Sequence, residues 1–370
     1  MKVFFDHQIF SMQKYGGASK YFSELLKNIP FEYWTSSLLF SENEYIKGMP
    51  EFSCVMSLLK QNLRGKYYLM DILNRPFSIS KILLGSFDIL HQTHFTPYYP
   101  SNFLRKRKLV MTMHDMNHTK FRHLYPKSRI YDANRIQEEQ KALINKSDAV
   151  VAVSRSTKDD LINLWNIEAD KIKVIYHGIE INESMIEDLS NFSISYPYVL
   201  FVGARNGFKN FSTFLRAFMQ ISDKYPDLNI VCTGMPFTKE ELIDFDQLRI
   251  KKKVHHISAS EQEMHYLYSK AEFFIYPSLS EGFGMPILEA MACDCPVVLS
   301  NSSCFPEIAG DAGIYFDPEN ADDIAYKMER TLNDTQLKLQ ISHLAKQRVT
   351  GFSWKKTASE HLDLYKHLIS

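Results

Sequence analysis

Two glutamates eight positions apart are the residues of this chain most suited to chemistry. Glu281 and Glu289 stand in the run S-E-G-F-G-M-P-I-L-E-A, after an apolar segment and at the start of a helical one. Its two glycines allow a tight turn that a ligand can approach closely, and Pro286 suits the first turn of a helix. Because free N–H groups at a helix start bind anions, we expect both carboxylates to flank one anionic ligand. A capped helix with solvated glutamates is the alternative.

A second candidate site follows another apolar segment. Arg205 and Lys209 lie in the run V-G-A-R-N-G-F-K-N, just before a helical stretch. A guanidinium offers a fork of donors and an ammonium offers a point charge, so the pair suits a diphosphate. Loop cations are often only solvated, but two such loops at strand ends of the same domain favour a shared site.

Several histidines form a third group. His91, His94, His114, Asp115 and His118 all lie near the ends of expected strands. Imidazole and carboxylate groups are good metal ligands, so a metallohydrolase is one interpretation. Neither histidine pair stands in a helical H-E-x-x-H context. A structural role, or contact between His114 and a bound substrate, are the other interpretations.

Short apolar segments and amphipathic segments alternate along both halves of the chain. We expect strands at residues 3–5, 89–91, 109–114, 148–154, 173–176, 198–203, 228–233, 254–257, 272–276 and 296–300. We expect helices at residues 18–28, 130–146, 157–165, 211–222, 239–248, 261–270 and 286–293, and nearly continuous helix from 321. This alternation predicts α/β architecture, with parallel sheets that are covered by helices on both faces.

A polar, acidic stretch interrupts the alternation near the middle. We therefore expect an N-terminal domain at residues 1–180, a linker at 181–197, a second domain at 198–352 and a final helix at 353–370 that packs back on the N-terminal domain. The prediction is two doubly wound domains that face each other across a cleft. In such sheets ligands bind beyond the carboxyl ends of the strands.

Composition excludes several classes of protein. Lys plus Arg and Asp plus Glu both number 43, so the basic excess that is typical of nucleic-acid-binding proteins is absent. No stretch approaches the ~18 apolar residues that span a bilayer. Asp6 and His7 interrupt the N-terminus before a signal-peptide core could form. We expect a cytoplasmic protein.

The motifs together resemble those of family 4 glycosyltransferases, which are retaining, nucleotide-sugar-dependent enzymes of the GT-B fold. The Glu-x7-Glu signature stands at Glu281 and Glu289, and the donor-phosphate loop stands as V-G-A-R-N-G-F-K-N. An N-terminal glycine loop reads Y-G-G-A-S-K-Y-F, a histidine motif reads M-T-M-H-D-M-N-H, a domain-crossing segment reads V-I-Y-H-G-I-E and the last helix opens with F-S-W. The resemblance covers nearly the whole chain in order.

The resemblance implies roles for the second domain. Arg205 and Lys209 would neutralise the donor diphosphate, Glu281 would accept a hydrogen bond from the donor sugar, and Glu289 would bind the nucleotide ribose. Backbone N–H groups along the turn would contact the sugar and the diphosphate; these belong to Gly282, Phe283, Gly284 and Met285. Fixed positive charge aimed at the leaving diphosphate stabilises the transition state of transfer.

The resemblance also implies roles for the first domain. Gly16 and Gly17 would bring their loop close to the reacting phosphate, and His114 would orient the donor sugar. No metal or other cofactor is expected, because the cationic side chains and the helix start supply the positive field. Asp244 and Asp246 form a D-x-D sequence, the metal motif of another glycosyltransferase fold, but they stand in a helical stretch and are expected to face solvent.

The opening Q-K-Y-G-G-A-S-K-Y-F resembles mannosyltransferases of O-antigen assembly. This implies transfer of mannose from GDP-mannose to a glycan acceptor, expected to be lipid-linked, in bacterial surface polysaccharide synthesis. Three alternatives stay open: a UDP-sugar-dependent enzyme of the same fold, a non-catalytic sugar-nucleotide-binding protein, and a dinucleotide-dependent oxidoreductase. The last lacks a G-x-G-x-x-G after the first strand.

A basic run in the first half suggests a membrane contact. The run at residues 105–108 reads R-K-R-K, with Tyr98, Tyr99 and Phe103 just before it, and residues 1–190 carry 25 basic against 21 acidic side chains. Basic residues near an anionic lipid surface each contribute about 1 kcal/mol. We expect peripheral contact with the cytoplasmic face of the inner membrane. A solvated turn is the alternative.

Overall fold

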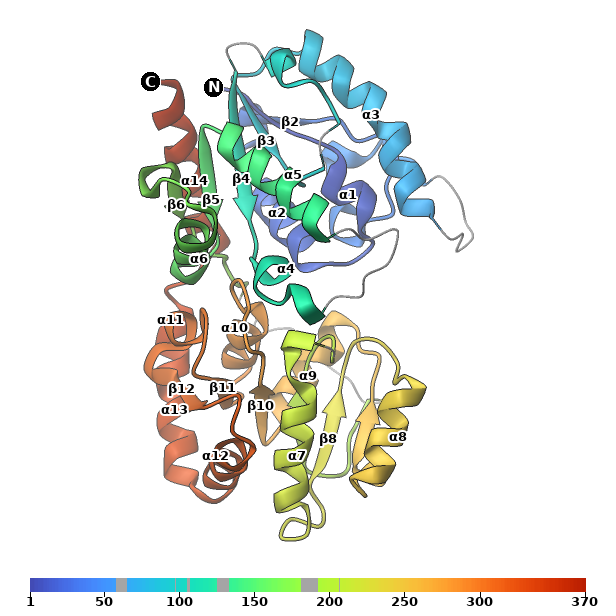
Figure 1. Cartoon of the computed structure of the whole chain (residues 1–370), viewed down its shortest axis with the longest axis vertical. Coiled ribbons are helices and arrows are strands. Elements are labelled where there is room, and N and C mark those ends of the chain that lie inside the picture. Colours follow the sequence, from blue (N-terminus) through green and yellow to red (C-terminus); the bar gives the residue numbers. More distant parts are fainter. Residues whose placement is uncertain (58–64, 97, 105–106, 125–132, 181–191, 206) are drawn as a thin grey trace. The chain divides into compact units, whose positions relative to one another are not determined.

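The chain forms two compact units in a computed structural model (Figure 1). Unit 1 comprises Met1–Thr119, Pro126–Gly178 and Ser353–Ser370, and unit 2 comprises Lys120–Tyr125 and Ile179–Phe352. The structure describes all residues except 58–64, 97, 105–106, 125–132, 181–191 and 206. The inclusion of Lys120–Tyr125 in unit 2 departs from the sequence-based boundaries. This short segment belongs to unit 2 because it packs there: the Phe121 ring stacks on the Phe208 ring, with centroids 5.7 Å apart.

Unit 1 is built on a parallel sheet with the strand order β2-β1-β3-β4-β5-β6. Its strands are β1 Val3–Phe5, β2 Trp34–Ser36, β3 Ile89–Gln92, β4 Lys108–Met113, β5 Ala149–Ala152 and β6 Ile172–Val174. The register places Val3 beside Ile89 and Phe5 beside His91. Every residue of β1, β3 and β5 is buried, as expected for a parallel sheet that is covered on both faces.

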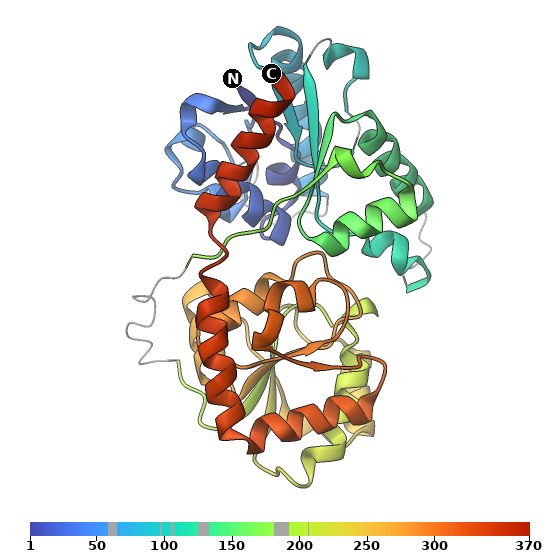
Figure 2. The same cartoon turned by 90° about the vertical axis from the view of Figure 1, so that its left-hand side faces the viewer.

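The C-terminal helix belongs to unit 1, as the sequence predicted. Seven α-helices lie before residue 178 or after residue 353 in the part of the chain that the structure describes. They are α1 Gln8–Met12, α2 Gly17–Asn28, α3 Lys66–Leu84, α4 Asn117–Lys120, α5 Ala133–Lys146, α6 Arg155–Trp165 and α14 Trp354–Ile369. Helix α14 packs against α2 (Figure 2). The Tyr21 hydroxyl lies 2.8 Å from Nε2 of His361, and Ser353 caps the helix by accepting a hydrogen bond from the N–H of Lys356.

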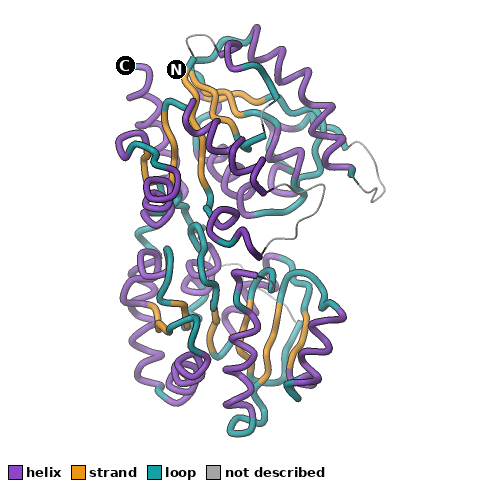
Figure 3. Tube along the Cα trace, viewed as in Figure 1, coloured by secondary structure: helices purple, strands orange, loops and turns teal. Residues whose placement is uncertain are grey.

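Unit 2 is built on a second parallel sheet, whose strands are orange in the lower half of Figure 3. Its strand order is β12-β11-β10-β7-β8-β9. Its strands are β7 Tyr198–Phe201, β8 Asn229–Cys232, β9 Val254–His256, β10 Phe273–Tyr276, β11 Val297–Ser300 and β12 Gly313–Phe316. From β7 the following strands β8 and β9 are added on one side, and from β10 the strands β11 and β12 are added on the other side. The strand order therefore reverses between β7 and β10, which is where doubly wound sheets bind ligands.

The helices of unit 2 follow the strands in alternation. They are α7 Phe211–Ser222, α8 Lys239–Gln247, α9 Glu261–Lys270, α10 Met285–Ala292, α11 Phe305–Ala309, α12 Ala321–Asn333 and α13 Thr335–Val349. Local sequence explains two of the helix starts: Thr238 with Glu241, and Ser260 with Glu263, form capping boxes. A buried cluster around Phe201, Phe214 and Phe218 fills the core between sheet and helices.

The predicted α/β class is confirmed, and most predicted elements lie within a few residues of their observed bounds. The sequence analysis missed the strands β2 and β12 and the helices α1, α3, α4 and α11. Helix α3 was not found because Pro76 stands inside it, and a proline within a helical pattern is read as the end of a helix. In the structure the polar side chains of Asp71, Asn74 and Ser78 are buried, whereas several large apolar side chains are exposed.

Candidate active site

The candidate site of unit 2 lies at the point where the strand order reverses. Strand β7 leads into the loop that carries Arg205 and Lys209, and strand β10 leads into the loop that carries Glu281. Because β7 and β10 are parallel neighbours, both loops leave from the same edge of the sheet. The two motifs found in the sequence therefore meet at this edge.

Hydrogen bonds join the two loops beside Lys209. The N–H of Leu279 donates to the carbonyl oxygen of Phe208 over 2.8 Å, and Nδ2 of Asn210 donates to the carbonyl oxygen of Pro277 over 3.1 Å. Lys209 stands between these two attachment points in the chain. Its backbone is thereby held against the segment that leads into Glu281.

Lys209 and Glu281 form an ion pair. Nζ of Lys209 lies 2.7 Å from Oε1 of Glu281, and the side chains are 17% and 11% exposed. The same ammonium lies 5.5 Å from the centroid of the Tyr276 ring. Burial, followed by the nearby Glu281 carboxylate, raises the pKa of Tyr276 well above its usual value, so its hydroxyl stays protonated. The site thus holds a cation, an acceptor and a hydroxyl together at a partly exposed position.

Ser303 fixes the backbone of Glu281. The N–H of Glu281 donates to Oγ of Ser303 over 3.2 Å, and that hydroxyl donates to the carbonyl oxygen of Glu281 over 2.7 Å. The sequence analysis missed Ser303 and Tyr276, and neither stands in a motif that would have revealed it. Both act across the sheet edge, from segments distant in the sequence.

The turn after Glu281 opens helix α10. Gly284 caps the helix with φ of +86°, in the left-handed region, and a Cβ there would lie 3.0 Å from Cδ1 of Ile287. The helix starts at Met285, one residue before the predicted start. The Phe283 side chain is buried against the ring of Phe352, with centroids 6.0 Å apart. Only the backbone of Phe283, together with that of Gly282 beside it, can therefore contact a ligand.

Glu289 lies one turn further along α10. The Tyr268 hydroxyl, from α9, donates to Oε2 of Glu289 over 3.2 Å. This contact orients the carboxylate, and Tyr268 is buried within unit 2. Glu281 and Glu289 thus stand on one loop–helix unit, each with its direction fixed by a neighbouring side chain.

Arg205 is held differently from Lys209. Its Nε lies 2.7 Å from Oε1 of Glu241, its Nη2 donates to the carbonyl oxygen of Met235 over 2.7 Å, and its guanidinium lies 4.9 Å from the Phe237 ring centroid. The side chain is buried. Among the described residues, its buried Nη1 has no hydrogen-bond partner. Arg205 is therefore clamped to the start of α8, with only Nη1 left to bind an anion.

The predicted residues of unit 1 stand at the start of α2 and after β4. Gly16 precedes the first residue of α2, and a Cβ on it would lie 2.2 Å from Oε1 of Gln13. A Cβ on Gly17 would meet no atom within 4 Å. Because that oxygen is the far end of a flexible side chain, packing alone does not require glycine at position 16, and Gly17 faces open space at a helix N-terminus.

His114 is an uncharged ring in an aromatic setting. It packs edge-on against Tyr21 and His177, with ring centroids 5.1 Å and 6.2 Å away. Burial, then the nearby His94, lowers the pKa of His114 to about 4, so the ring is neutral at pH 7. Within the described chain its buried Nε2 has no hydrogen-bond partner. It can give or accept one hydrogen bond but cannot supply positive charge.

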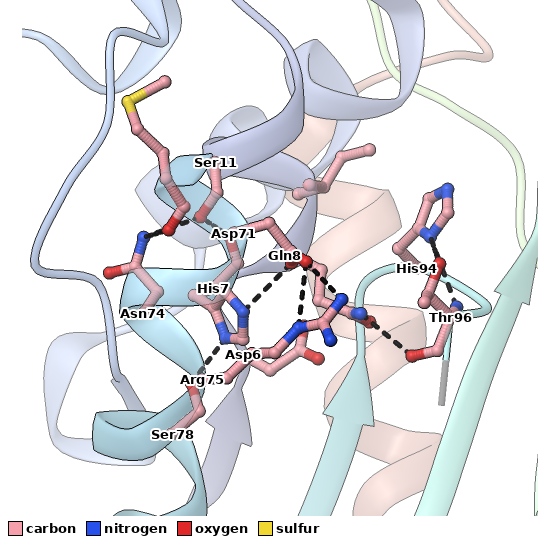
Figure 4. A network of polar contacts seen from close by, with 12 residues as sticks. Asp6, His7, Gln8, Ser11, Asp71, Asn74, Arg75, Ser78, His94 and Thr96 are labelled. Carbon is pink, nitrogen blue, oxygen red and sulfur yellow. Dashed lines mark hydrogen bonds and ion pairs between the residues drawn. The ribbon is translucent and has the colours of Figure 1, made fainter. Parts of the chain in front are cut away.

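A polar network occupies the carboxyl ends of β1 and β3, where the strand order of unit 1 reverses (Figure 4). Asp6 accepts hydrogen bonds from the N–H and hydroxyl of Thr93 over 2.9 and 2.5 Å, and Gln8 donates to the carbonyl oxygen of Thr96 over 2.9 Å. The N–H of Thr96 donates to Nδ1 of His94 over 3.3 Å, so the proton of the neutral ring is on Nε2. The sequence analysis considered His94 as a metal ligand or a structural residue and did not place it in this network.

The geometry disfavours the metallohydrolase interpretation. His91 is engaged at both ring nitrogens, by the Tyr365 hydroxyl at 2.6 Å and the Thr112 hydroxyl at 2.8 Å. Within the described ranges, no three His, Cys, Asp or Glu side chains gather as metal ligands would. Asp244 and Asp246 are exposed on α8, as predicted, and Asp246 pairs with Lys251 at 2.5 Å.

The described part of the basic run is used within the fold. Arg107 donates to the carbonyl oxygens of Ile82 and Gly85 at the end of α3, and Lys108 lies 3.1 Å from an oxygen of Asp148. Arg105 and Lys106 lie outside the described residues. Tyr98, Tyr99 and Phe103 pack against the core of unit 1 rather than forming an exposed patch. Of the helices that the structure describes, none combines the length and apolarity needed to cross a membrane.

Comparison with known families supports the resemblance drawn from the motifs. Residues 187–348 match the family model for glycosyl transferases group 1, and residues 54–183 match the model for glycosyltransferase family 4. The resemblance to family 4 glycosyltransferases is confirmed, and these matches identify the chain as a glycosyltransferase.

Individual relatives come from glycan assembly. The chain is 27% identical over 288 residues to O-antigen chain mannosyltransferase B of Escherichia coli, covering 73% of this chain and 74% of that protein. It is 26% identical over 224 residues to an N-acetylgalactosaminyltransferase of Campylobacter jejuni, whose named acceptor is a sugar-linked diphospho-undecaprenol, with 60% of each chain covered. Among solved structures, Anabaena HepE in complex with UDP-glucose has a TM-score of 0.72 at 18% identity, covering 99% of this chain and all of that one. This last likeness confirms the fold.

Proposed function

We propose that this glycosyltransferase moves mannose from GDP-mannose to a lipid-linked glycan, with retention of anomeric configuration. The observation that carries the proposal is the Lys209–Glu281 ion pair, at 2.7 Å, beside the N-terminus of α10. A cation, a sugar-hydroxyl acceptor and a helix N-terminus at one sheet edge match the parts of a nucleotide diphosphate sugar.

Each group has a role in the proposed reaction. Lys209 and the N–H groups at the start of α10 stabilise negative charge as it grows on the leaving diphosphate. Glu281 accepts a hydrogen bond from a sugar hydroxyl, and Glu289 accepts one from the ribose. Arg205 offers Nη1 to the diphosphate from its clamped position. The contacts of Gly16, Gly17 and His114 with the donor stay predictions.

The donor and acceptor are proposed from relatives. The Escherichia coli relative is named as an O-antigen chain mannosyltransferase, which supports mannose as the sugar. The Campylobacter jejuni relative is named for a diphospho-undecaprenol acceptor, which supports a lipid-linked glycan as the acceptor. A UDP-sugar is the second candidate donor, because a structure of the same fold holds UDP-glucose.

A donor screen followed by a transfer assay tests the proposal. GDP-mannose, UDP-glucose and ADP-glucose are compared by thermal shift, since binding to the folded state raises the melting temperature. The preferred donor is then incubated with an undecaprenyl-diphosphate oligosaccharide, and the anomeric proton of the product is observed by NMR. GDP-mannose should give the largest shift and an α-mannoside product.

Four results would count against the proposal. A larger shift with UDP-glucose would move the assignment to the second donor. Donor binding without transfer to any glycan would favour the non-catalytic alternative. A β-linked product from an α-linked donor would overturn retention. Transfer that disappears with chelator and returns with magnesium or manganese would show that Lys209 and the helix start do not provide the positive field alone.

A further inference from the structure

Helix α14, red in Figure 2, is joined to α2 by a hydrogen bond in the interior of unit 1. The Tyr21 hydroxyl lies 2.8 Å from Nε2 of His361, and Nδ1 of His361 lies 2.8 Å from the carbonyl oxygen of Thr357. All three residues are buried. Because a carbonyl oxygen can only accept, the proton of the neutral His361 ring is on Nδ1. Nε2 therefore accepts, and the Tyr21 hydroxyl donates.

Burial keeps both groups in the forms that this bond needs. Burial lowers the pKa of His361 to about 4, so the ring is neutral at pH 7. Burial also raises the pKa of Tyr21 above its usual value, so the hydroxyl keeps the proton that it donates. A buried donor or acceptor that loses its partner is costly. The bond therefore restricts rotation of the Tyr21 side chain.

The Tyr21 ring is also a direct neighbour of His114. The planes of the two rings stand at 85°, with centroids 5.1 Å apart, and the adjacent Phe22 ring stands at 79° to His114 over 5.9 Å. Perpendicular arrangements of this kind are favourable for aromatic rings. Since no described residue binds the buried Nε2 of His114, these ring contacts contribute to the orientation of the imidazole.

Tyr21 lies one turn after the glycine loop as well. It follows Gly17, the first residue of α2, by four positions, so the two residues lie on the same side of the helix. The N–H of Lys20 donates to the carbonyl oxygen of Gly16 over 2.9 Å, which extends the helical hydrogen bonds into the loop. A fixed Tyr21 side chain therefore limits rotation of the first turn of α2.

We propose that Tyr21 is a positioning residue, whose hydrogen bond to His361 holds the His114 ring and the start of α2 in the orientation that glycosyl transfer requires. The proposal rests on the proposed function, because Tyr21 acts through His114 and not on the donor itself. A displacement of about 1 Å at a reacting centre can slow a reaction roughly 100-fold. Helix α14 thus contributes to the rate from outside the donor site.

Tyr21→Phe tests this role, because it keeps the ring and removes only the hydroxyl. The matched control is Tyr365→Phe: the Tyr365 hydroxyl lies 2.6 Å from Nδ1 of His91, and both residues are buried. The control also removes a tyrosine–histidine bond of α14, but that bond leads to β3 instead of α2. Both variants should lower the melting temperature by similar amounts. Tyr21→Phe should lower kcat about tenfold with donor KM within twofold of wild type, and Tyr365→Phe should leave both within twofold.

A His114→Ala background separates positioning from a general loss of packing. If Tyr21 acts through His114, Tyr21→Phe should change kcat less than twofold in that background, because the two residues then share one effect. A tenfold loss in both backgrounds, or an equal loss in Tyr365→Phe, would overturn the proposal. His361→Gln keeps an acceptor for the Tyr21 hydroxyl and should retain more of kcat than His361→Ala. Equal kcat in these two variants would contradict the role of the bond.

NMR of the imidazole rings supplies a readout that needs no donor. In protein with isotope-labelled histidine, the His114 ring signals are identified by their absence from the spectrum of His114→Ala. Tyr21→Phe should shift these signals, whereas Tyr365→Phe should leave them in place. Unchanged His114 signals in Tyr21→Phe would overturn the positioning role even if transfer occurs as proposed. Absence of transfer from every donor would instead refute the proposed function, and the ring spectra would still decide whether Tyr21 orients His114.

Discussion

Replacing Lys209 by methionine and Glu281 by glutamine tests the candidate site most directly. The two atoms of the ion pair lie 2.7 Å apart. At an effective dielectric constant of about 20, the raw attraction at that distance is roughly 6 kcal/mol. Because both side chains are mostly buried, desolvation offsets much of this attraction. The pair is therefore a modest stabiliser that can exchange partners when a diphosphate arrives.

The two single variants should change nucleotide binding in opposite directions. Lys209→Met removes a charge-assisted contact to the diphosphate, which is worth about 1.5–3 kcal/mol, so GDP affinity should fall roughly 10- to 150-fold. Glu281→Gln releases Lys209 from its present partner, so free GDP should bind several-fold more tightly. The same variant should slow sugar transfer, because the amide is a weaker acceptor for the donor hydroxyl.

Calorimetry with free GDP and initial-rate transfer assays provide the two measurements. The matched control is Lys224→Met, because Lys224 forms an ion pair of the same 2.7 Å length with Glu329 on the surface of unit 2. That variant should leave GDP binding and transfer unchanged. Unchanged GDP affinity in Lys209→Met, or weakened affinity in Glu281→Gln, would refute the assignment of this edge to the diphosphate.

Four further predictions follow from the contacts. Glu241→Ala should weaken donor binding about tenfold by releasing Arg205, and Glu241→Gln should restore part of it; calorimetry with equal affinity in both variants would show that the clamp has no role. Gly284→Ala should destabilise unit 2 by about 1–2 kcal/mol in urea unfolding and weaken donor binding, because φ is +86° there; a neutral substitution would contradict this. Burial lowers the pKa of His361 to about 4 from its ordinary 6.5, so the stability that this neutral ring provides is present above pH 6.5 and lost as the pH falls toward 4. The loss is up to ~3 kcal/mol, and His361→Gln should flatten the pH dependence of unfolding; parallel curves would exclude this group as the cause. Transfer should survive excess EDTA, and inactivation that magnesium reverses would require a metal site.

Local sequence was enough to predict most strands, most helices and the two loops of the candidate site. Alternating apolar and amphipathic segments fix element type through the periodicity of strands and helices. The capping boxes at Thr238 and Ser260 fix two helix starts, and Gly284 with Pro286 fixes the turn into α10. These features depend on residues within a few positions of one another, so they can be read without knowing the fold.

The tertiary structure decided which side chains meet. Lys209 and Glu281 are 72 positions apart, and their pairing exists because β7 and β10 are neighbours in the sheet. The same sheet edge brings Glu241 to Arg205, a partner that no sequence spacing indicates.

Helix α3 shows that sequence patterns do not determine which face of a helix is buried. Asn74 and Asp71 form hydrogen bonds with Leu39 and His7, which lie far away in the sequence, and these contacts hold the polar side of the helix inward. The sequence determines what each segment can become, through local backbone preference and periodicity. Which face is buried, and which charges share a site, depends on contacts that only the folded chain creates.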